Sequence, residues 1–333
     1  MAALSTAYQT FADIAKMKDP GGGFAYIINV LSEFRPMLSD AFVFEGNLPT
    51  GNRTTLVTTL PTGTWRLINK GVTSTKGTTR QVDDACGQIA RYAAVDATLA
   101  RLGGDINGLR ARNDAMYLEG ISNDVIDAVI YGNSGVNPEQ PHGFAPRYNS
   151  LTGTPGSTNV ISGGGSGADN TSVWLITWGA NQVGLMYPKG TKAGLLTQDL
   201  GETNWPDSDT NYYRAYVSYY EWTVGLAVMD YRYVTRICNI DVSNLTADAS
   251  SGADLMDKMS DAYFSRPSMD LGNMARTYFY CNKTVAKYLT KQAQNKSNVL
   301  LSIDNPAGKP VVSFYNAPVH ICDAITETEA TIS

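Results

Sequence analysis

The chain has 333 residues, of which 43% are hydrophobic and 17% are charged, and its formal net charge is −5. This length allows a sizeable buried core, but the acidic balance excludes a protein that binds nucleic acid through an overall basic surface. The four cysteines stand far apart without a CxxC pair, which argues against a zinc site and a disulfide framework. The apolar runs are too short to span a bilayer.

The first 40 residues predict an arm made of two short helices. Apolar residues recur at helical spacing in residues 2–17 and again in residues 27–34. Between them, an Asp-Pro-Gly-Gly-Gly run at residues 19–23 ends the first helix and provides a hinge.

Residues 46–82 predict a long β-hairpin. They are rich in threonine interleaved with apolar residues, and residues 60–63 (Leu-Pro-Thr-Gly) have the composition of a turn. No acidic residue lies between Glu45 and Asp83. An isolated hairpin has too little apolar surface to be stable in water, so we expect it to lie on an acidic or neutral surface. Its basic residues are Arg53, Arg66, Lys70, Lys76 and Arg80.

Residues 105–131 predict the clearest helix of the chain. Asp105 is a suitable N-cap, and Gly132 with Asn133 is a suitable end. An apolar stripe with a spacing of four residues runs along it: Tyr117, Ile121, Val125 and Val129. At about 1.5 Å per residue the helix is about 40 Å long, which is long for a globular domain.

The remainder predicts an α+β fold without internal repeats. A Gly/Ser-rich loop covers residues 151–170, and a helix is expected at residues 252–264 and another from Asn282, as cap, to about residue 293. Strand patterns occur at residues 173–177, 212–220, 223–229, 233–240, 277–281 and 311–325.

The residues that could carry chemistry are few. His142 lies in a turn, and His320 lies two residues from Cys322, either as a catalytic dyad or as strand residues that share one face. The sequence Lys-Gly-Thr at residues 189–191 lacks the spacing of a phosphate-binding loop. An acidic stretch is open to three interpretations: acid–base or divalent-ion chemistry, a solvated loop, or a dock for a basic partner. It contains Asp199, Glu202, Asp207 and Asp209.

The stretch from residue 178 to residue 202 is interpreted as architecture. We expect its glycines to form tight turns between short strands, with Lys189 and Lys192 as surface or interface charges. These glycines are Gly179, Gly184, Gly190 and Gly194.

The order of arm, long hairpin, long helix and mixed sheet with two helices resembles the major capsid proteins of tailed bacteriophages, which have the Hong Kong 97-like fold. The local sequence is most similar to capsid proteins of certain short-tailed phages. The resemblance covers nearly the whole chain and rests on an ordered set of stretches: residues 143–147, 178–202, 236–241, 278–282 and 318–325.

The resemblance implies a domain plan. Residues 1–40 would be the N-terminal arm, and residues 41–88 an extended loop that lies across a neighbouring subunit. Residues 89–240 would form a peripheral domain with the helix at 105–131 as its spine, and residues 241–333 most of the axial domain. Because the strand-rich stretch 171–240 precedes the helix–strand–helix unit, we also predict a rearranged strand order.

The resemblance also implies a structural protein and not an enzyme, without cofactor or metal. Copies of the chain would form pentamers and hexamers of an icosahedral shell around double-stranded DNA, without sequence-specific contact. Since no long charged helical segment precedes the arm, a separate scaffolding protein is expected, with a portal protein and a cement or decoration protein as further partners. The protein would be made in the bacterial cytoplasm and reside in the virion.

The candidate interface residues belong to the hairpin and to the acidic stretch. Trp65 and Leu67 would be apolar anchors, and Arg53, Arg66 and Lys70 would select the docking site, with the acidic stretch as one receiver. In some relatives a hairpin lysine is cross-linked to an asparagine. Lys70 and Lys76 have suitable positions, with Asn295 or Asn298 as partners, but no motif fixes the pair. The alternatives are a phage decoration or tail protein and a hydrolase that uses Asp199, Glu202 or Asp207.

Overall fold

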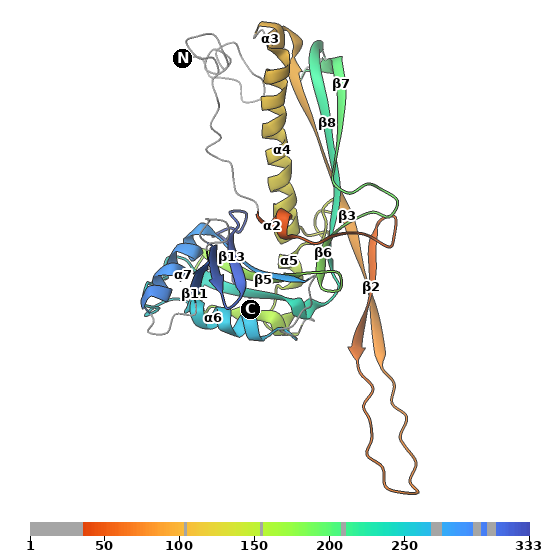
Figure 1. Cartoon of the computed structure of the whole chain (residues 1–333), viewed down its shortest axis with the longest axis vertical. Coiled ribbons are helices and arrows are strands. Elements are labelled where there is room, and N and C mark those ends of the chain that lie inside the picture. The colour runs from red at the N-terminus through yellow and green to blue at the C-terminus, as the bar shows by residue number, and fades with distance from the viewer. Residues whose placement is uncertain are drawn as a thin grey trace. The chain divides into compact units, whose positions relative to one another are not determined.

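The computed structural model describes residues 36–102, 105–153, 156–207, 211–267, 275–295, 301–304 and 311–333 (Figure 1). The two predicted arm helices lie outside these residues. The elements contributed by the first half of the chain are α2 (Pro36–Asp40), β1 (Val43–Glu45), β2 (Gly51–Thr59), β3 (Thr78–Asp96), α3 (Ala97–Leu102), α4 (Ile106–Tyr131), α5 (Phe144–Arg147), η1 (Ser157–Asn159) and β4 (Val160–Ser162). The second half contributes β5 (Asn170–Trp178), β6 (Val183–Tyr187), β7 (Leu195–Pro206), β8 (Tyr212–Val228), η2 (Tyr231–Tyr233), β9 (Val234–Asp241), α6 (Leu255–Phe264), β10 (Arg276–Cys281), α7 (Lys283–Asn295), β11 (Leu301–Asp304), β12 (Val311–Phe314) and β13 (Ala317–Ile321).

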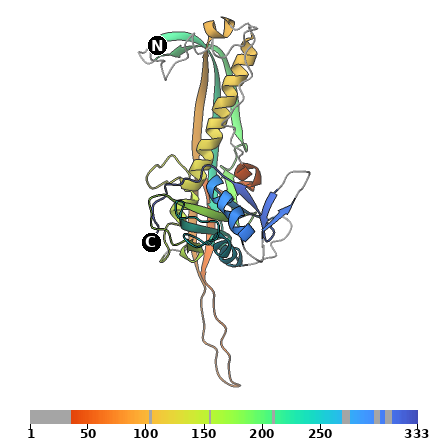
Figure 2. The same ribbon diagram turned by 90° about the vertical axis from the view of Figure 1, so that its left-hand side faces the viewer.

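Helix α4 confirms the predicted long helix almost to the residue and is continuous in Figures 1 and 2. The Asp105 carboxylate accepts a hydrogen bond from the Gly108 N–H at 2.8 Å, as expected of a cap. Of the predicted stripe, Ile121, Val125 and Val129 are buried. No helix in the described part of the chain is both long and apolar enough to cross a membrane.

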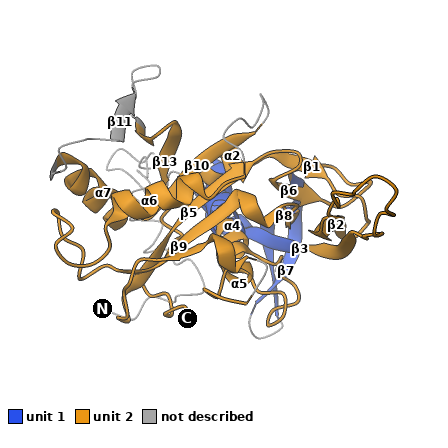
Figure 3. Ribbon diagram, turned by 90° about the horizontal axis from the view of Figure 1, so that it is seen from below, with its two compact units in different colours: residues 1–33, 88–125, 195–222 blue, residues 34–87, 126–194, 223–333 orange. Residues whose placement is uncertain are grey.

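The described chain divides into two compact units (Figure 3). Unit 1 comprises residues 88–125 and 195–222, and unit 2 comprises the described residues of 34–87, 126–194 and 223–333. Strands β5, β6 and β9 fall in unit 2 together with the described residues after 241, and the plan of peripheral and axial domains stays a prediction.

Unit 1 is built from most of α4, the second half of β3 and the β7–β8 hairpin. Strands β7 and β8 pair antiparallel from Leu195↔Trp222 to Pro206↔Tyr212. A small core of Val95, Ala100 and Leu109 joins β3, α3 and α4. The prediction of two strands at 212–220 and 223–229 was wrong, because they form one strand, β8. Of the three interpretations of the acidic stretch, the solvated loop does not hold for Asp199 and Glu202, which lie in β7. The pairing of β7 with the tyrosine-rich β8 outweighs the weak strand propensity of its Gly and Asp residues.

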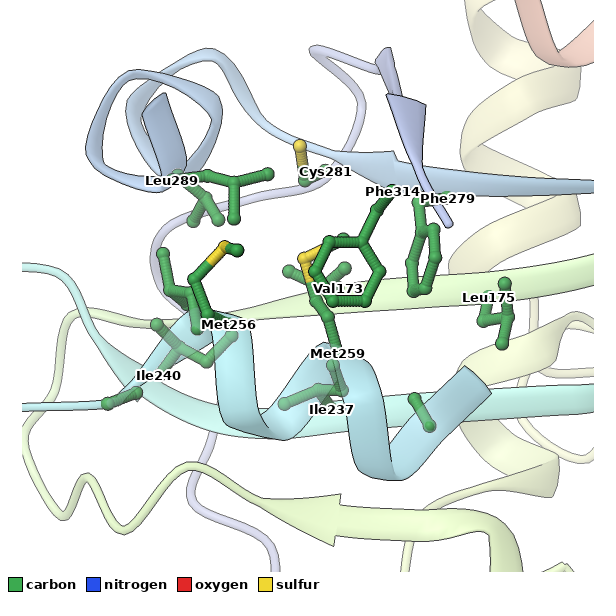
Figure 4. Packing of buried hydrophobic residues seen from close by; sticks show 14 of the residues in the cluster. Val173, Leu175, Ile237, Ile240, Met256, Met259, Phe279, Cys281, Leu289 and Phe314 are labelled. Atoms are coloured by element: carbon green, nitrogen blue, oxygen red, sulfur yellow. The ribbon is translucent and has the colours of Figure 1, made fainter. Parts of the chain in front are cut away.

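The core of unit 2 lies around β5, which is buried along its whole length. Strand β5 pairs antiparallel with β10 on one edge and with β9 on the other, so that Leu175 is opposite both Phe279 and Thr235. Side chains alternate between the two faces of a strand. Val173 and Leu175 therefore pack with Met256 and Met259 of α6 and Leu289 of α7, in the cluster of Figure 4.

The other face of β5 carries the aromatic residues Trp174 and Trp178. They contact Phe144 of α5, at ring-centroid distances of 5.8 and 6.1 Å. Both faces of the strand are thus covered, which explains why its residues 173–176 are apolar without alternation. From β5 the neighbouring strands of unit 2 follow the order β10, β13, β12, β11 in one direction and β6, β8 in the other. The rearrangement relative to other family members stays a prediction.

The hairpin of β2 and the first half of β3 also belongs to unit 2. The strands pair from Gly51↔Ala85 to Thr59↔Thr78, and residues 60–77 beyond them form no strand. The turn predicted at residues 60–63 was wrong. The chain reverses at residues 67–70, where the Lys70 N–H donates to the Leu67 carbonyl at 3.1 Å and Asn69 has a φ of 65°. Asparagine tolerates this left-handed conformation better than most residues, so it competes with the Pro-Thr-Gly sequence for the turn.

Candidate assembly surface

The most exposed apolar side chains of the described chain gather at the end of the hairpin, residues 60–77, which we call the hairpin tip. Trp65 has a relative exposure of 102%, and Leu67 and Ile68 have 69% and 89%. Basic side chains stand among them: Arg66, Lys70 and Lys76 are exposed. Tryptophan and arginine are enriched in protein–protein hot spots, and Trp65 and Arg66 are neighbours in this tip.

Arg53, the other basic candidate, differs from the residues of the tip. Its guanidinium donates to both carboxylate oxygens of Asp83 at 2.6 and 2.7 Å. This hydrogen bond lowers the pKa of Asp83. Arg53 therefore stabilises the pairing of β2 with β3 across the hairpin.

The root of the hairpin is fixed by a buried ion pair. Arg147 of α5 lies 2.8 Å from the Asp84 carboxylate of β3, and both side chains are 3% exposed. Arg147 also donates to the carbonyls of His142 and Leu226. The burial of His142 lowers the pKa of its imidazole. No local sequence pattern marks this pair, because arginine and aspartate are common and 63 residues separate them.

The acidic candidates are engaged within unit 1. Asp199 lies 2.5 Å from Arg110, whose hydrogen bond, followed by that of the Gly201 N–H, lowers the pKa of the carboxyl. Glu202 pairs with Arg101 and Arg214 at 2.8 and 3.2 Å.

The other two acidic candidates belong to the end of this stretch. Asp207 accepts a hydrogen bond from the Asn211 N–H, and Asp209 lies outside the described residues. The hairpin candidates up to Lys76 belong to unit 2, and the acidic candidates belong to unit 1.

His320, which was considered as a partner of Cys322, contacts Asp40 instead. His320 Nδ1 lies 2.6 Å from Asp40 Oδ2, which also accepts from the Tyr280 hydroxyl at 2.9 Å. Burial raises the pKa of the Cys322 thiol to about 11, so it is protonated at neutral pH. The group ties α2 to strands β10 and β13.

A second buried ion pair joins residues that sequence reasoning missed. Arg236 of β9 donates to Glu329 at 2.9 Å, and both side chains are 5% exposed. Glu329 also accepts from the Tyr131 hydroxyl at 2.6 Å and from the Ser172 hydroxyl. One carboxylate thus connects the end of α4, strands β5 and β9 and the last residues of the chain.

The remaining candidates from the sequence are the glycines, the cysteines and possible metal ligands. Gly190 has a φ of 81° and lies in a turn as predicted, Gly194 has a φ of 95° and lies in a bend, and Gly184 lies inside β6. The four cysteines are free thiols. No group of three His, Cys, Asp or Glu side chains that could hold a metal ion occurs in the described ranges.

This fold defines a class of protein. A chain in the near-atomic resolution structure of bacteriophage Epsilon15 is similar over 100% of this chain and 99% of its own length, with a TM-score of 0.75 and 35% identity. The capsid of bacteriophage JBD30 is similar in fold alone, with a TM-score of 0.50 and 12% identity over 96% of this chain and 99% of the other. The protein is a phage capsid subunit with the predicted α+β, Hong Kong 97-like fold.

The family follows from the sequence. Residues 19–333 match the family described as major capsid protein GP7, and the chain belongs to this family. No curated protein matches the sequence. Its function is to assemble with copies of itself into the phage capsid shell, and the alternative of a decoration or tail protein is not favoured.

Proposed function

We propose that copies of this chain form the pentamers and hexamers of an icosahedral shell around double-stranded DNA, and that the hairpin tip docks on a neighbouring subunit. The observation that carries the docking is the complete exposure of Trp65 next to the exposed residues Leu67 and Ile68. Covering a large apolar side chain contributes about 1.5–3 kcal/mol, and each subunit of a shell repeats the contact, so that modest contacts add up.

Trp65 and Leu67 are the apolar anchors of this contact, while Arg66, Lys70 and Lys76 select its position. Exposed charges steer association more than they add affinity. Arg53 is not part of the docking set, because Asp83 already neutralises it.

The docking is tested with the double variant Arg66→Glu/Lys70→Glu. We expect a folded monomer with unchanged circular dichroism and a strongly reduced shell yield in negative-stain electron microscopy. The matched control, Lys283→Glu/Lys287→Glu, reverses two exposed charges on α7 and assembles like the unmodified protein. Normal shells from the hairpin variant would contradict the docking.

The same proposal assigns roles to the units. The α6–α7 core of unit 2 acts as the axial domain, α4 acts as the spine of the peripheral domain, and the first 40 residues act as the arm. In this proposal the protein has no catalytic activity. Its partners are a separate scaffolding protein, a portal protein and a cement protein. It is synthesised in the bacterial cytoplasm. The acidic net charge of −5 keeps packaged DNA from adhering to the wall.

A further inference from the structure

A second exposed aromatic group lies on unit 2, at the C-terminal end of α6. It consists of Tyr263, Phe264 and Tyr315, which we call the aromatic patch. The ring of Tyr315 lies 5.0 Å from that of Tyr263 and 5.4 Å from that of Phe264. Phe264 is 59% exposed and Tyr315 is 37% exposed. These two aromatic side chains are exposed together, which soluble surfaces avoid unless the patch contacts a partner.

The backbone of the patch gives a second reason to expect a partner. Tyr315 begins the two-residue turn between β12 and β13 and has a φ of 48°. Turns of this kind favour glycine or asparagine at such a φ, and a bulky residue there is strained. Strained residues of this kind concentrate at functional sites. The tyrosine keeps an unfavourable conformation in which its ring stays partly exposed.

Carboxylates lie beside the aromatic patch on the same helix. Asp257 and Asp261 are exposed and four residues apart, so they share a face of α6 that leads to Phe264. Within the patch, the guanidinium of Arg266 lies over the Tyr263 ring at 4.1 Å and is buried. The outward face of the patch is therefore aromatic with an acidic border.

We propose that the aromatic patch receives the hairpin tip of a second copy of this chain. The two surfaces match in chemistry: the tip presents Trp65 and Leu67 with basic neighbours, and the patch presents Phe264 and Tyr315 with acidic neighbours. Aromatic pairs and opposite charges at the border both favour such a contact. The inference rests on the proposed docking of the hairpin and names its receiver.

The alternative receiver, the acidic stretch on β7, is less suited. Its carboxylates Asp199 and Glu202 already bind Arg110, Arg101 and Arg214 of their own chain. A basic tip would have to compete with these ion pairs.

Photo-crosslinking tests the assignment in assembled shells of the full chain. p-Benzoylphenylalanine at position 65 replaces one aromatic side chain with another and reacts with its nearest neighbour. In shells mixed from isotopically light and heavy copies, we expect light–heavy crosslinked peptides that contain Phe264 or Tyr315. Crosslinks confined to other segments, including β7, or their complete absence from intact shells would overturn the assignment.

Two substitutions test the patch from the other side. Tyr315→Gly removes the ring and relieves the strained φ, so the monomer keeps its stability while we expect the shell yield to fall by about tenfold. Phe264→Ala acts in the same direction. Tyr212→Ala is the matched control, because Tyr212 is 72% exposed but lies on β8 of unit 1, and it assembles normally.

The outcomes separate this inference from the proposed function. If Tyr315→Gly and Phe264→Ala assemble normally while Trp65→Ala does not, the hairpin docks elsewhere and the assignment of the patch is wrong. If Trp65→Ala also assembles normally, the docking of the hairpin itself is wrong.

Discussion

The core around β5 and the hairpin tip show two ways of using apolar residues within unit 2. In the core, Leu175 and Phe279 are covered by α6 and α7 of the same chain. In the tip, Trp65 and Leu67 are exposed. The core therefore stabilises the monomer, whereas the tip gains its stabilisation only from another subunit. The hairpin root, held by Asp84 and Arg147, belongs with the core although it carries the tip.

The largest expected effect comes from the hairpin root. Arg147→Met leaves the Asp84 carboxylate buried without its partner, and breaking a buried ion pair in this way costs about 3–5 kcal/mol. Urea denaturation of the monomer measures the loss. The double variant Arg147→Met/Asp84→Leu removes both charges and regains part of it. A loss below about 1 kcal/mol in the single variant would show that the root is not part of the core.

A cavity in the core has the next largest effect. Leu289→Ala removes a side chain that is 1% exposed and lowers the free energy of unfolding by about 2–4 kcal/mol. Lys287→Ala, at an exposed position on the same helix, changes it by less than about 0.5 kcal/mol. Equal effects of the two substitutions in urea denaturation would contradict the described packing of α7.

The tip is expected to show the opposite behaviour. Trp65→Ala changes monomer stability by less than about 0.5 kcal/mol, because the side chain is fully exposed, yet it abolishes most of the shell yield. Calorimetry of the monomer and electron microscopy of the assembly reaction measure the two quantities. A clear drop in the melting temperature of the monomer would place Trp65 in an intramolecular contact.

The reactivity of the cysteine thiols tests, without a mutation, whether the core stays closed in the monomer. Burial raises the pKa of Cys281 to about 12 and those of Cys86 and Cys238 to about 11. At pH 8 the thiols are protonated and react poorly with a disulfide reagent. We expect rapid labelling only after denaturation. Fast labelling of the native monomer would show that the core opens readily.

The smallest effect is expected on the surface of unit 1. The pKa of Asp199 is lowered by Arg110, so its contribution to stability is complete above the unfolded pKa of about 4 and disappears as the pH falls through the lowered value. Because the carboxyl is 61% exposed, the contribution is at most about 1 kcal/mol. Asp199→Asn should match the unmodified protein at low pH and differ slightly at pH 7 in urea denaturation.

Features that depend on neighbouring residues could be predicted from the sequence. The N-cap Asp105 and the apolar stripe were enough to predict α4 from the sequence. The predicted cap of α7 is confirmed as well, because Asn282 accepts a hydrogen bond from the Val285 N–H at 2.8 Å. The break within β8 was wrong because residues 221–222, Glu-Trp, are not turn formers and the strand continues through them.

Features that depend on distant residues were not predictable. Asp40 and His320 are separated by 280 residues, and Arg236 and Glu329 by 93. No local pattern marks such a pair. Of the site, the exposed residues of the tip follow from composition and charge, whereas the aromatic patch requires the fold to bring α6 next to the β12–β13 turn.

The position of Glu329 has a consequence for how the protein is made. Tyr131, Ser172 and Arg236 all precede residue 329 in the chain, so a ribosome synthesises them before the carboxylate that joins them. A chain truncated before residue 329 lacks this carboxylate, buries the charge of Arg236 without its acidic partner inside unit 2 and is destabilised. The ion pair can therefore form only after residue 329 has been synthesised.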